Sequence, residues 1–301
     1  MPEQMMNTRE VAEYLGINEK QVYALIKEGT IPCTRVTGKW VFPRNLIDEW
    51  ILSTARESAS AQSAVRRTEG HLLAAGSNDP VLDLLMNRLN YEDFRIFSCN
   101  TGSTEGLRLL GEGRSDIAWC HIYDANTGTY NVPYVSSHLA DKKIAMLHLF
   151  YRETGILVSP EALEKIKKFE DIASGVRFVN RQKGSGIRIL LDHTLQKKGI
   201  ETAAVNGYDD EVCTHLEVGL AIKSGKADVG ISSVAISKLL ELAFVPLVRE
   251  SFDMVVGKDA FFSRGIQAFI ETLQAKDFRK IVAPLGDYDF ADSGKIIYSS
   301  N

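Results

Sequence analysis

From residue 71 onward, the sequence alternates short apolar runs with amphipathic stretches at helical spacing. HLLAAGS precedes VLDLLMNRL, FRIFSCNTGS precedes TEGLRLLGEG, and GVRFVNRQKGSG precedes IRILLDHTLQKKG. Strands that alternate with helices in this way are typical of an α/β domain whose sheet is mostly parallel and covered by helices. We therefore expect the larger part of the chain to have an α/β fold.

The first 30 residues have a different pattern. Apolar residues recur at three- and four-residue spacing on both sides of Gly16, which predicts two short helices joined by a tight turn. Thr8 and Asn18 are expected to cap the two helices, because their side-chain oxygens can accept bonds from free amide groups. Gly29 is expected to end the second helix in a left-handed conformation.

A hairpin and a third helix should follow. Residues 34–42 contain Thr37-Gly38 between apolar and aromatic residues, which predicts a compact hairpin. Residues 44–51 then form the expected third helix. The sequence thus divides into a small domain at 1–53, a linker at 54–70 and the α/β domain at 71–301.

Several tracts of the small domain match one family. They are EVAEYLG (Glu10 to Gly16), VYALIKEG (Val22 to Gly29), Ile31-Pro32, Lys39-Trp40 and Arg44. Together they resemble the excisionase-type, MerR-like winged helix-turn-helix. The resemblance implies DNA binding through a recognition helix and a wing, with contacts from Lys20, Gln21, Tyr23, Lys27, Arg35, Lys39 and Arg44.

The charges of this domain are consistent with that interpretation. Between Lys20 and Arg44 there are five basic residues and one acidic residue, although the whole chain has a net charge of −4. Lys and Arg would contact phosphates, whereas Gln21 could recognise an adenine edge. Glu19 departs from the basic residue often found there in the family, which leaves the base preference open. The alternative is a solvated charged face on a domain that binds protein.

The linker sequence STARESASAQSAVRRTE is rich in Ala and Ser and has almost no large apolar residues. It could be a free tether or a helix that forms a dimer and sets the spacing of two DNA half-sites. We expect a homo-oligomer, since palindromic sites need a two-fold protein, but the sequence does not decide between the two forms of the linker.

Three predicted strand-to-helix turns are rich in glycine and hydroxyl residues. Such turns place free backbone N–H groups and a hydroxyl at the positive end of a helix, which predicts an anion site. Asp79 before Pro80 is interpreted as a helix cap. The turns do not have the spacing of nucleotide-binding glycine loops, so a nucleotide is not expected. The candidate residues are Ser77, Asn78, Thr101, Gly102, Ser103, Gly184, Ser185 and Gly186.

A second resemblance covers about residues 71–299. The tracts RFVNRQKGSGIRILLD, GKADVGISS, FVPLVRESFDMVV and GSTEGLRLLGEGRSDIAWCHI resemble the periplasmic-binding-protein-like domain that some bacterial regulators share with molybdate and tungstate receptors. GDYDFADSGKI matches the same regulator domain and is interpreted as structural. The resemblance implies a type II two-lobed fold, with the first lobe at 71–123 plus the C-terminal tail and the second at 150–240.

In that fold a ligand lies between the lobes. Arg181 is the expected anion-binding side chain, because a guanidinium group supplies several fixed donors and a permanent charge. Arg188 is a rival, although its place within a helix favours an ion pair. Ser232 and Ser233 follow a predicted buried strand, and either could face the ligand. The sequence therefore predicts a one-component regulator that senses a tetrahedral oxyanion, molybdate or tungstate, and needs no cofactor.

Other functions remain open. A small organic acid or amino acid is one alternative ligand, with Asp79, Asp124 or Asp209 to bind its amine. An excisionase-like architectural factor and an enzyme or carrier of the molybdenum cofactor pathway are two others. We expect no enzyme, because the six histidines lack metal-protease spacing and no serine has the nucleophile-elbow pattern. The histidines are interpreted as surface or core residues.

The remaining features concern location and redox state. The chain starts without a signal-peptide pattern and has no long apolar stretch, which predicts a cytoplasmic protein with no membrane contact. Cys33, Cys99, Cys120 and Cys213 are scattered, so neither a zinc site nor a disulfide framework is indicated. All four are expected to be buried small apolar residues.

Overall fold

The computed structural model describes residues 5–65, 71–89 and 94–300. The chain divides into two compact units, Met1–Thr68 and Glu69–Asn301. The Ala- and Ser-rich stretch predicted as a linker spans the boundary between them, and its residues 66–70 lie outside the described residues.

The first unit combines helices with a small sheet of strand order β1-β3-β2. Its described elements are β1 (Met5–Met6), α1 (Thr8–Leu15), α2 (Glu19–Glu28), β2 (Thr34–Val36), β3 (Lys39–Pro43) and α3 (Arg44–Val65). Val11, Val22, Phe42 and Ile47 are fully buried and form the centre of its core. The expected helix-turn-helix followed by a hairpin is confirmed.

The helix ends of this unit follow from their capping residues. Asn7, and not Thr8, caps α1: its side chain accepts from the Glu10 amide, and the Glu10 carboxylate accepts from the Asn7 amide at 2.7 Å. The expectation for Thr8 was wrong by one residue because Asn also satisfies free amide groups at a helix start. Asn18 caps α2 and Gly29 ends it at a φ of 68°, both as expected.

The wing and the third helix complete the unit. Thr37 and Gly38 both have positive φ, as a two-residue type I′ hairpin turn requires. The helix expected at 44–51 continues as α3 to Val65. Glycine and proline do not occur between Arg44 and Val65, and Ala is the best helix former, so the stretch that resembled a linker is helical as far as Val65.

One mixed sheet runs through the described part of the second unit. Its strand order is β11-β10-β12-β9-β13-β6-β4-β5, and β14 pairs with β9 beside this path. The strands are β4 (His71–Gly76), β5 (Arg95–Asn100), β6 (Ile117–Cys120), β9 (Ile144–Val158), β10 (Phe178–Arg181), β11 (Glu211–Val212), β12 (Val229–Ser233), β13 (Ala243–Gly257) and β14 (Ile296–Ser299). A separate hairpin is formed by β7 (Tyr123–Asp124) and β8 (Thr129–Tyr130).

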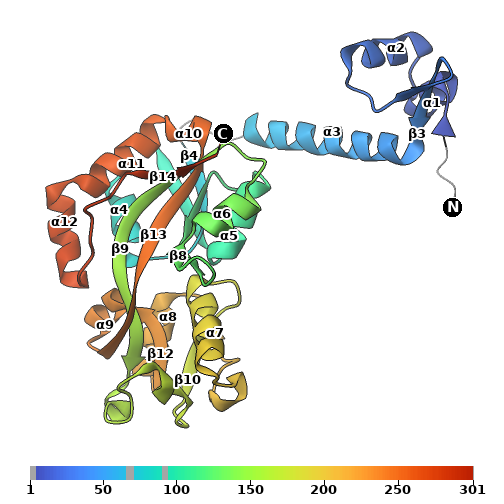
Figure 1. Ribbon diagram of the computed structural model, residues 1–301. Helices are drawn as coiled ribbons and strands as arrows, with labels where there is room; N and C mark the ends of the chain where they lie inside the picture. Colours follow the sequence, from blue (N-terminus) through green and yellow to red (C-terminus); the bar gives the residue numbers. More distant parts are fainter. Residues whose placement is uncertain (1–4, 66–70, 90–93, 301) are drawn as a thin grey trace. The chain divides into compact units, whose positions relative to one another are not determined.

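The sheet extends through two lobes, and β9 and β13 run from one lobe into the other (Figure 1). In the first lobe β13 pairs with β6 through Asp253–Val256, and in the second β9 pairs with β12 through Thr154–Val158. The two strands pair with each other along their length, with register shifts between Pro246 and Val248 and between Phe252 and Asp253. The expected two-lobed α/β architecture is confirmed.

Helices lie against the sheet in both lobes (Figure 1). Those of the first lobe are α4 (Pro80–Arg88), α5 (Ser103–Gly111), α6 (Val132–His138), α10 (Lys258–Phe261), α11 (Arg264–Gln274) and α12 (Lys276–Val282). Those of the second are α7 (Gly186–Lys198), α8 (His215–Lys223) and α9 (Val234–Leu240). Short 3-10 turns occur at Pro160–Ala162, Phe169–Ala173, Thr202–Ala204 and Ala283–Leu285.

The strand directions differ in part from the expectation. The β4–β5, β4–β6, β10–β11 and β10–β12 pairs are parallel, as strand-helix-strand units predict. The long strands β9 and β13 are antiparallel to each other and to their neighbours. They are also 15 residues each, which is unusually long for a strand. The sheet is therefore mixed, because two crossing strands join the lobes.

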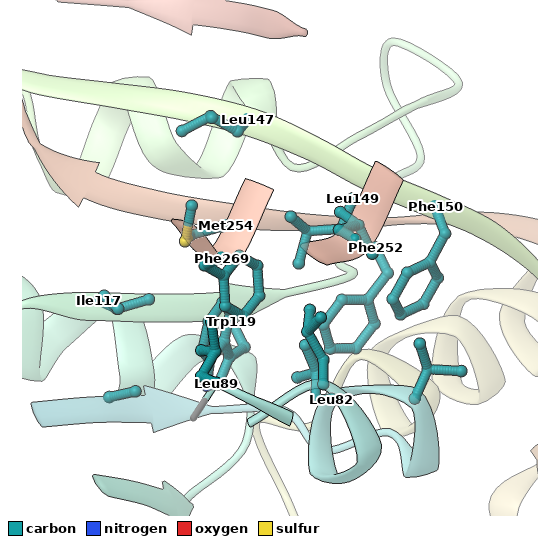
Figure 2. Close-up of a cluster of buried hydrophobic side chains, with 14 of the residues drawn as sticks. Leu82, Leu89, Ile117, Trp119, Leu147, Leu149, Phe150, Phe252, Met254 and Phe269 are labelled. Carbon is teal, nitrogen blue, oxygen red and sulfur yellow. The ribbon is translucent and has the colours of Figure 1, made fainter. Parts of the chain in front are cut away.

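Each lobe has its own apolar core. In the first lobe, Trp119, Phe269 and Met254 pack beside Phe150 and Phe252, and all five are fully buried (Figure 2). The Trp119 and Phe269 rings are stacked with centroids 5.6 Å apart. The second lobe packs α7 on the sheet through residues such as Leu191, Leu195 and Ile231. The buried apolar residues form two clusters in each lobe, around Trp119 and Leu107 in the first and around Leu191 and Val218 in the second.

The cysteine prediction was wrong for most of the four residues. Cys120 is fully buried in the first lobe, as expected, but Cys99 and Cys213 are exposed and Cys33 is half-buried. All four thiols are free. Cys99 is exposed because it lies on β5, the terminal strand of the sheet path.

Candidate ligand-binding site

Two serines from the ends of first-lobe strands contact each other. Ser77 follows β4 and Ser103 is the first residue of α5, and their hydroxyl oxygens are 2.7 Å apart. The Ser103 hydroxyl also accepts from the backbone amide of His121 at 3.3 Å. Both serines are buried. Since two hydroxyls joined by one hydrogen bond keep a second proton, the pair can still donate to a further acceptor.

The backbone amides of these turns are mostly used within the protein. The amides of Thr101 and Gly102 both donate to the carbonyl of Gly76, and the amide of Ser77 donates to Trp119. The Thr104 amide donates to Gly184 at 3.2 Å. The expectation that such turns offer free amides to an anion is wrong for these residues, because the first-lobe turns use them to hold each other in place.

The turn before α7 brings the second lobe against the first. Thr104 donates both its amide and its hydroxyl to the carbonyl of Gly184, the hydroxyl at 2.9 Å. A β-carbon on Gly102 would lie 3.4 Å from that carbonyl, and one on Gly186 would lie 2.3 Å from the carbonyl of His121. Ser185 caps α7 by accepting from the Arg188 amide. Glycines are needed here because the two lobes meet backbone to backbone.

Arg181, at the end of β10, is buried and only partly paired. Its Nη2 donates to the carbonyl of Cys213 at 2.9 Å, and its Nε lies 3.4 Å from the Gln182 side-chain oxygen. Burial, and then the charge of Arg152, lower the pKa of Arg181 to about 10. Arg188, the rival candidate, forms ion pairs with Asp192 and Glu211. Arg188 is thus engaged in the structure of its own lobe.

A network of buried charges occupies the crossing strands. Arg152 of β9 forms ion pairs with Asp79 and with Glu250 of β13, and all three are buried. Thr154 donates to Glu250 at 2.7 Å, and the Tyr288 hydroxyl donates to Asp79. Although burial opposes it, Glu250 and Asp79 raise the pKa of Arg152. Asp79 is therefore more than the helix cap it was expected to be.

His215 links this network to the strand end at β12. Arg152 Nη2 lies 3.1 Å from His215 Nε2. His215 Nδ1 lies 3.1 Å from the Ser232 hydroxyl and 3.2 Å from the Ser233 backbone amide, so the ring contacts both serines at the end of β12. Ser232 in turn donates to the His215 carbonyl. Burial, Arg181 and Arg152 all lower the pKa of His215, so the ring is neutral.

His121 approaches the network from the first lobe. Its Nδ1 lies 3.0 Å from Glu250 Oε2, and its ring stacks on Phe252 with centroids 5.6 Å apart. Burial lowers the pKa of His121, although Glu250 acts in the opposite direction. Burial by itself would raise the pKa of Glu250, but His121 and Arg152 outweigh it and lower that pKa to about 2.

Five buried side-chain atoms around this network have no hydrogen-bond partner in the part of the chain that the structure describes. We call them the unpaired set: Asn78 Oδ1, His121 Nε2, Tyr130 OH, Arg181 Nη1 and Ser233 Oγ. They come from both lobes. Because an unsatisfied buried polar atom is costly, a group of them around one polar region favours a ligand that bonds to them.

The predicted site residues fall into three groups. The first group is joined by the contacts described above and consists of Ser77, Gly102, Ser103, Gly184, Ser185 and Gly186. Arg181 lies just before the turn that contains Gly184. Thr101 has its amide bonded to Gly76, while Asn78 contributes to the unpaired set. Ser232 is bonded to His215 on two sides, whereas its neighbour Ser233 has the unpaired hydroxyl. Ser233 is therefore the better candidate for a ligand contact.

Two families match the chain. A PBP superfamily domain matches residues 85–274, which is more than half of the chain, and a helix-turn-helix domain matches residues 5–55. The chain belongs to the PBP superfamily. This combination of a DNA-binding helix-turn-helix with a PBP superfamily domain fits a ligand-sensing transcriptional regulator.

Similar proteins include two bacterial relatives. The uncharacterized protein YvgK of Bacillus subtilis strain 168 is 30% identical over 301 residues, 96% of this chain and 96% of that protein. A shorter relative, an uncharacterized protein in the ferredoxin 2Fe-2S gene 5′ region of Clostridium pasteurianum, is 28% identical over 110 residues. That match covers 36% of this chain and 97% of the relative.

Solved structures support the fold. A putative phosphate ABC transporter substrate-binding protein from Clostridium perfringens has a TM-score of 0.52 at 14% identity and covers 75% of this chain and 99% of that chain. A cysteine-to-serine mutant of OxyR from Corynebacterium glutamicum has a TM-score of 0.50 at 15% identity, covering 93% of this chain and 90% of that chain. At these identities the likeness concerns the fold alone.

The PBP superfamily domain of this chain contains site residues that the sequence interpretation missed. Arg152, His121, His215 and Glu250 were not singled out, and the histidines were interpreted as ordinary surface or core residues. A signal was present in LFYRETGILV, where an arginine interrupts an apolar run that is long enough to be a buried strand. Arginine is almost never fully buried unless it is paired, so such a position predicts a buried partner.

The helix-turn-helix domain presents its candidate DNA-binding residues to solvent. Lys20, Tyr23 and Lys27 are exposed on α2, and Arg35, Lys39 and Arg44 are exposed on and beside the wing. The Gln21 side-chain oxygen accepts from the Asn18 amide at 3.1 Å, so an adenine contact by Gln21 must compete with this cap. Among the described residues, every helix is too short or too polar to cross a lipid bilayer.

Proposed function

We propose that this chain is a transcriptional regulator whose PBP superfamily domain binds a tetrahedral oxyanion, molybdate or tungstate. The observation that carries the proposal is Arg181, a buried cation whose Nη1 belongs to the unpaired set. A ligand oxygen with negative charge would supply both the missing hydrogen bond and a compensating charge. The remaining proton of the Ser77–Ser103 pair would go to a second oxygen of the same ion.

The choice among oxyanions is supported by the sequence. The tract NRQKGSG, which contains Arg181 and the turn before α7, is the most specific part of the resemblance to molybdate and tungstate receptors. The proposed donors Ser77 and Ser103 come from the first lobe and Arg181 from the second, so an ion between them could be bonded from two sides. We propose binding without chemical conversion and without a further cofactor.

Regulation would follow from a change in lobe arrangement. An ion that bonds Ser103 and Arg181 together stabilises the arrangement in which Thr104 contacts Gly184. It can change DNA affinity only as far as its own affinity differs between the two arrangements. We propose that the regulator acts in the cytoplasm as a homodimer on paired half-sites, with contacts from exposed α2 and wing residues such as Lys20, Lys27 and Lys39.

A small organic acid is the second candidate ligand. Asn78 Oδ1 and His121 Nε2 in the unpaired set are acceptor atoms, and a hydroxyl or ammonium group on the ligand would satisfy them. The bare ions molybdate and tungstate bring no such donor. An organic acid would place its carboxylate on Arg181 and its hydroxyl protons on these acceptors.

Calorimetric titration with tungstate, molybdate, sulfate and phosphate tests the oxyanion proposal. We expect tight binding of the first two and a loss of about 30-fold or more in Arg181→Met, because one partner of a buried charge contact is removed. Arg177→Met is the matched control on the same part of the chain, since the exposed Arg177 pairs with Asp228. Wild-type protein that binds none of the four ions would contradict the proposal and favour organic acids.

The regulatory half needs a separate measurement. DNA fragments selected from a random pool would be titrated with the full chain, with and without saturating tungstate. We expect tungstate to change the affinity for the selected fragments, and Arg181→Met to remove that effect while keeping the DNA affinity measured without tungstate. DNA affinity that tungstate leaves unchanged would favour an excisionase-like architectural factor.

A further inference from the structure

The proton on His121 is located by its contact with Glu250. His121 Nδ1 lies 3.0 Å from Glu250 Oε2, and a carboxylate can only accept at that distance. Nδ1 therefore carries a proton. His121 Nε2 is left either as a bare lone pair, when the ring is neutral, or as a donor, when the ring is protonated.

The edge of the His121 ring that carries Nδ1 and Cε1 lies against the start of the second-lobe helix α7. A β-carbon on Gly186, at the start of α7, would be 2.8 Å from both Cε1 and Nδ1 of His121. The backbone amide of His121 donates to Ser103, a member of the serine pair. Nε2 itself is buried and belongs to the unpaired set. His121 thus bonds to Ser103 of the serine pair and packs against the start of α7, and the charge of Arg181 acts on its ring.

In the described part of the chain, ionisable groups on β9, β10, β13 and α8 surround His121. Glu250 of β13 contacts Nδ1, and Arg152 of β9 and Arg181 of β10 act on the ring through their charges. His215 of α8 lies with its ring centroid 6.0 Å away. The two arginines disfavour a positive ring and Glu250 favours it. An anion beside Arg181 would oppose the effect of the two arginines on the pKa of His121 and so favour a positively charged ring.

A bare oxyanion creates a conflict at this position. Every atom that molybdate or tungstate presents is a hydrogen-bond acceptor, and a neutral His121 presents an acceptor as well. Two acceptors in contact in a buried site repel, and neither can turn to water. One proton between them converts the repulsion into a charge-assisted hydrogen bond.

We propose that His121 is an anion-binding residue which takes up one proton when a fully deprotonated oxyanion binds, so that Nε2–H donates to the ion. This inference rests on the proposed function and adds to it a residue and a coupled proton. No covalent bond changes within the ion: the proton comes from solvent and resides on Nε2 while the ion is bound.

The direction in which oxyanion affinity changes with pH follows from the coupling between ion binding and proton uptake on His121. Burial holds the pKa of His121 below its ordinary value in the protein alone, so the ring is neutral near neutral pH. The bound anion raises that pKa. Between the two pKa values, affinity rises by about tenfold for each unit that the pH falls, because one proton accompanies each ion.

Calorimetry in buffers with different heats of ionisation measures this proton directly. The full chain is titrated with sodium tungstate near pH 7.5 in two or more such buffers, and the slope of binding heat against ionisation heat gives the proton number. We expect about one proton taken up by the wild type and by His138→Gln. His138 is the matched control because it is exposed on α6 and its Nδ1 contacts Ser137 and the Tyr134 carbonyl, which are not proposed anion-binding groups.

His121→Gln separates the proposal from a structural role of the ring. An uncharged side-chain amide can donate to the ion without taking a proton, so this variant should bind tungstate with a proton number near zero and little pH dependence. Should the variant fail to fold, the pH dependence of wild-type affinity still decides. Tungstate binding by the wild type with no proton uptake and no pH dependence overturns the role of His121 alone. Absence of any oxyanion binding overturns the proposed function and this inference together.

Discussion

Two buried arginines on neighbouring parts of the sheet have opposite surroundings. Arg152 on β9 forms ion pairs with Asp79 and Glu250 and contacts His215. Arg181 on β10 has one carbonyl partner at 2.9 Å, one distant amide oxygen and an Nη1 in the unpaired set. Both are almost fully buried. A compensated buried charge belongs to the framework, whereas an uncompensated one indicates a place where something else binds.

The largest expected effect is on the free energy of unfolding, and it tests whether Arg152 is part of the structural framework. Arg152→Ala leaves two carboxylates buried without their cation, so we expect the free energy of unfolding to fall by about 3–5 kcal/mol. Arg249→Ala is the control, because its exposed ion pair with Asp289 should contribute about 1 kcal/mol or less. Urea denaturation of both variants measures the difference. Equal losses would mean that burial of the Arg152 network adds nothing.

Acid should weaken the same network. The pKa of Glu250 is lowered to about 2, so its contribution to stability is fully present above the unfolded value of about 4.3 and is lost as pH falls toward 2. Thermal unfolding followed from pH 6 to pH 2.5 should show this loss in the wild type. Glu250→Gln should be less stable at pH 6 and should lose less on acidification. Parallel curves for the two proteins would argue against an ionised Glu250.

Arg181→Met should behave in the opposite way to Arg152→Ala. Since no carboxylate of the described residues forms an ion pair with this cation, its loss leaves no buried carboxylate unpaired and removes its hydrogen bond to the Cys213 carbonyl. We expect the free energy of unfolding, measured without oxyanion, to stay within about 1 kcal/mol of the wild type. A loss as large as that of Arg152→Ala would place Arg181 in the framework.

The smallest expected change in the free energy of unfolding concerns a solvent-exposed cation of the DNA-binding domain. Lys20 is exposed on α2, so Lys20→Ala should change the free energy of unfolding by less than about 0.5 kcal/mol. It should instead lower the slope of log affinity for DNA against log salt by about 0.9, the value for one lost phosphate contact. Titrations at several salt concentrations measure the slope. An unchanged slope would remove Lys20 from the DNA interface.

The sequence predicted local structure better than it predicted the network between the lobes. Gly16, Gly29 and Thr37-Gly38 marked the turns of the small domain correctly, because turn residues act through their own backbone conformations. Thr8 failed as a cap only because Asn7 beside it has the same capacity. Local signals of this kind need no knowledge of distant parts of the chain.

Contacts between residues that are far apart in the sequence could not be predicted in the same way. Asp79 and Glu250 are 171 positions apart, yet both bind Arg152. Ser232 and Ser233 looked equivalent in the sequence, and only the position of His215 shows which hydroxyl is bonded. The turns at Ser77, Ser103 and Ser185 were identified, but the use of their neighbouring amides depends on which carbonyl each one meets. Nothing in the sequence indicated that two 15-residue strands, β9 and β13, would pair with each other.

That long pairing limits how the lobes can move. Because β9 and β13 are hydrogen-bonded to each other through both lobes, one lobe cannot slide past the other without breaking a ladder of backbone bonds. The motions that remain are bending and twisting of a two-stranded ribbon, most easily at its register shifts near Pro246 and Phe252. Arg152 and Glu250 lie between those two points. A bend of the ribbon at either point would therefore act directly beside the buried ion pairs of Arg152 with Asp79 and Glu250.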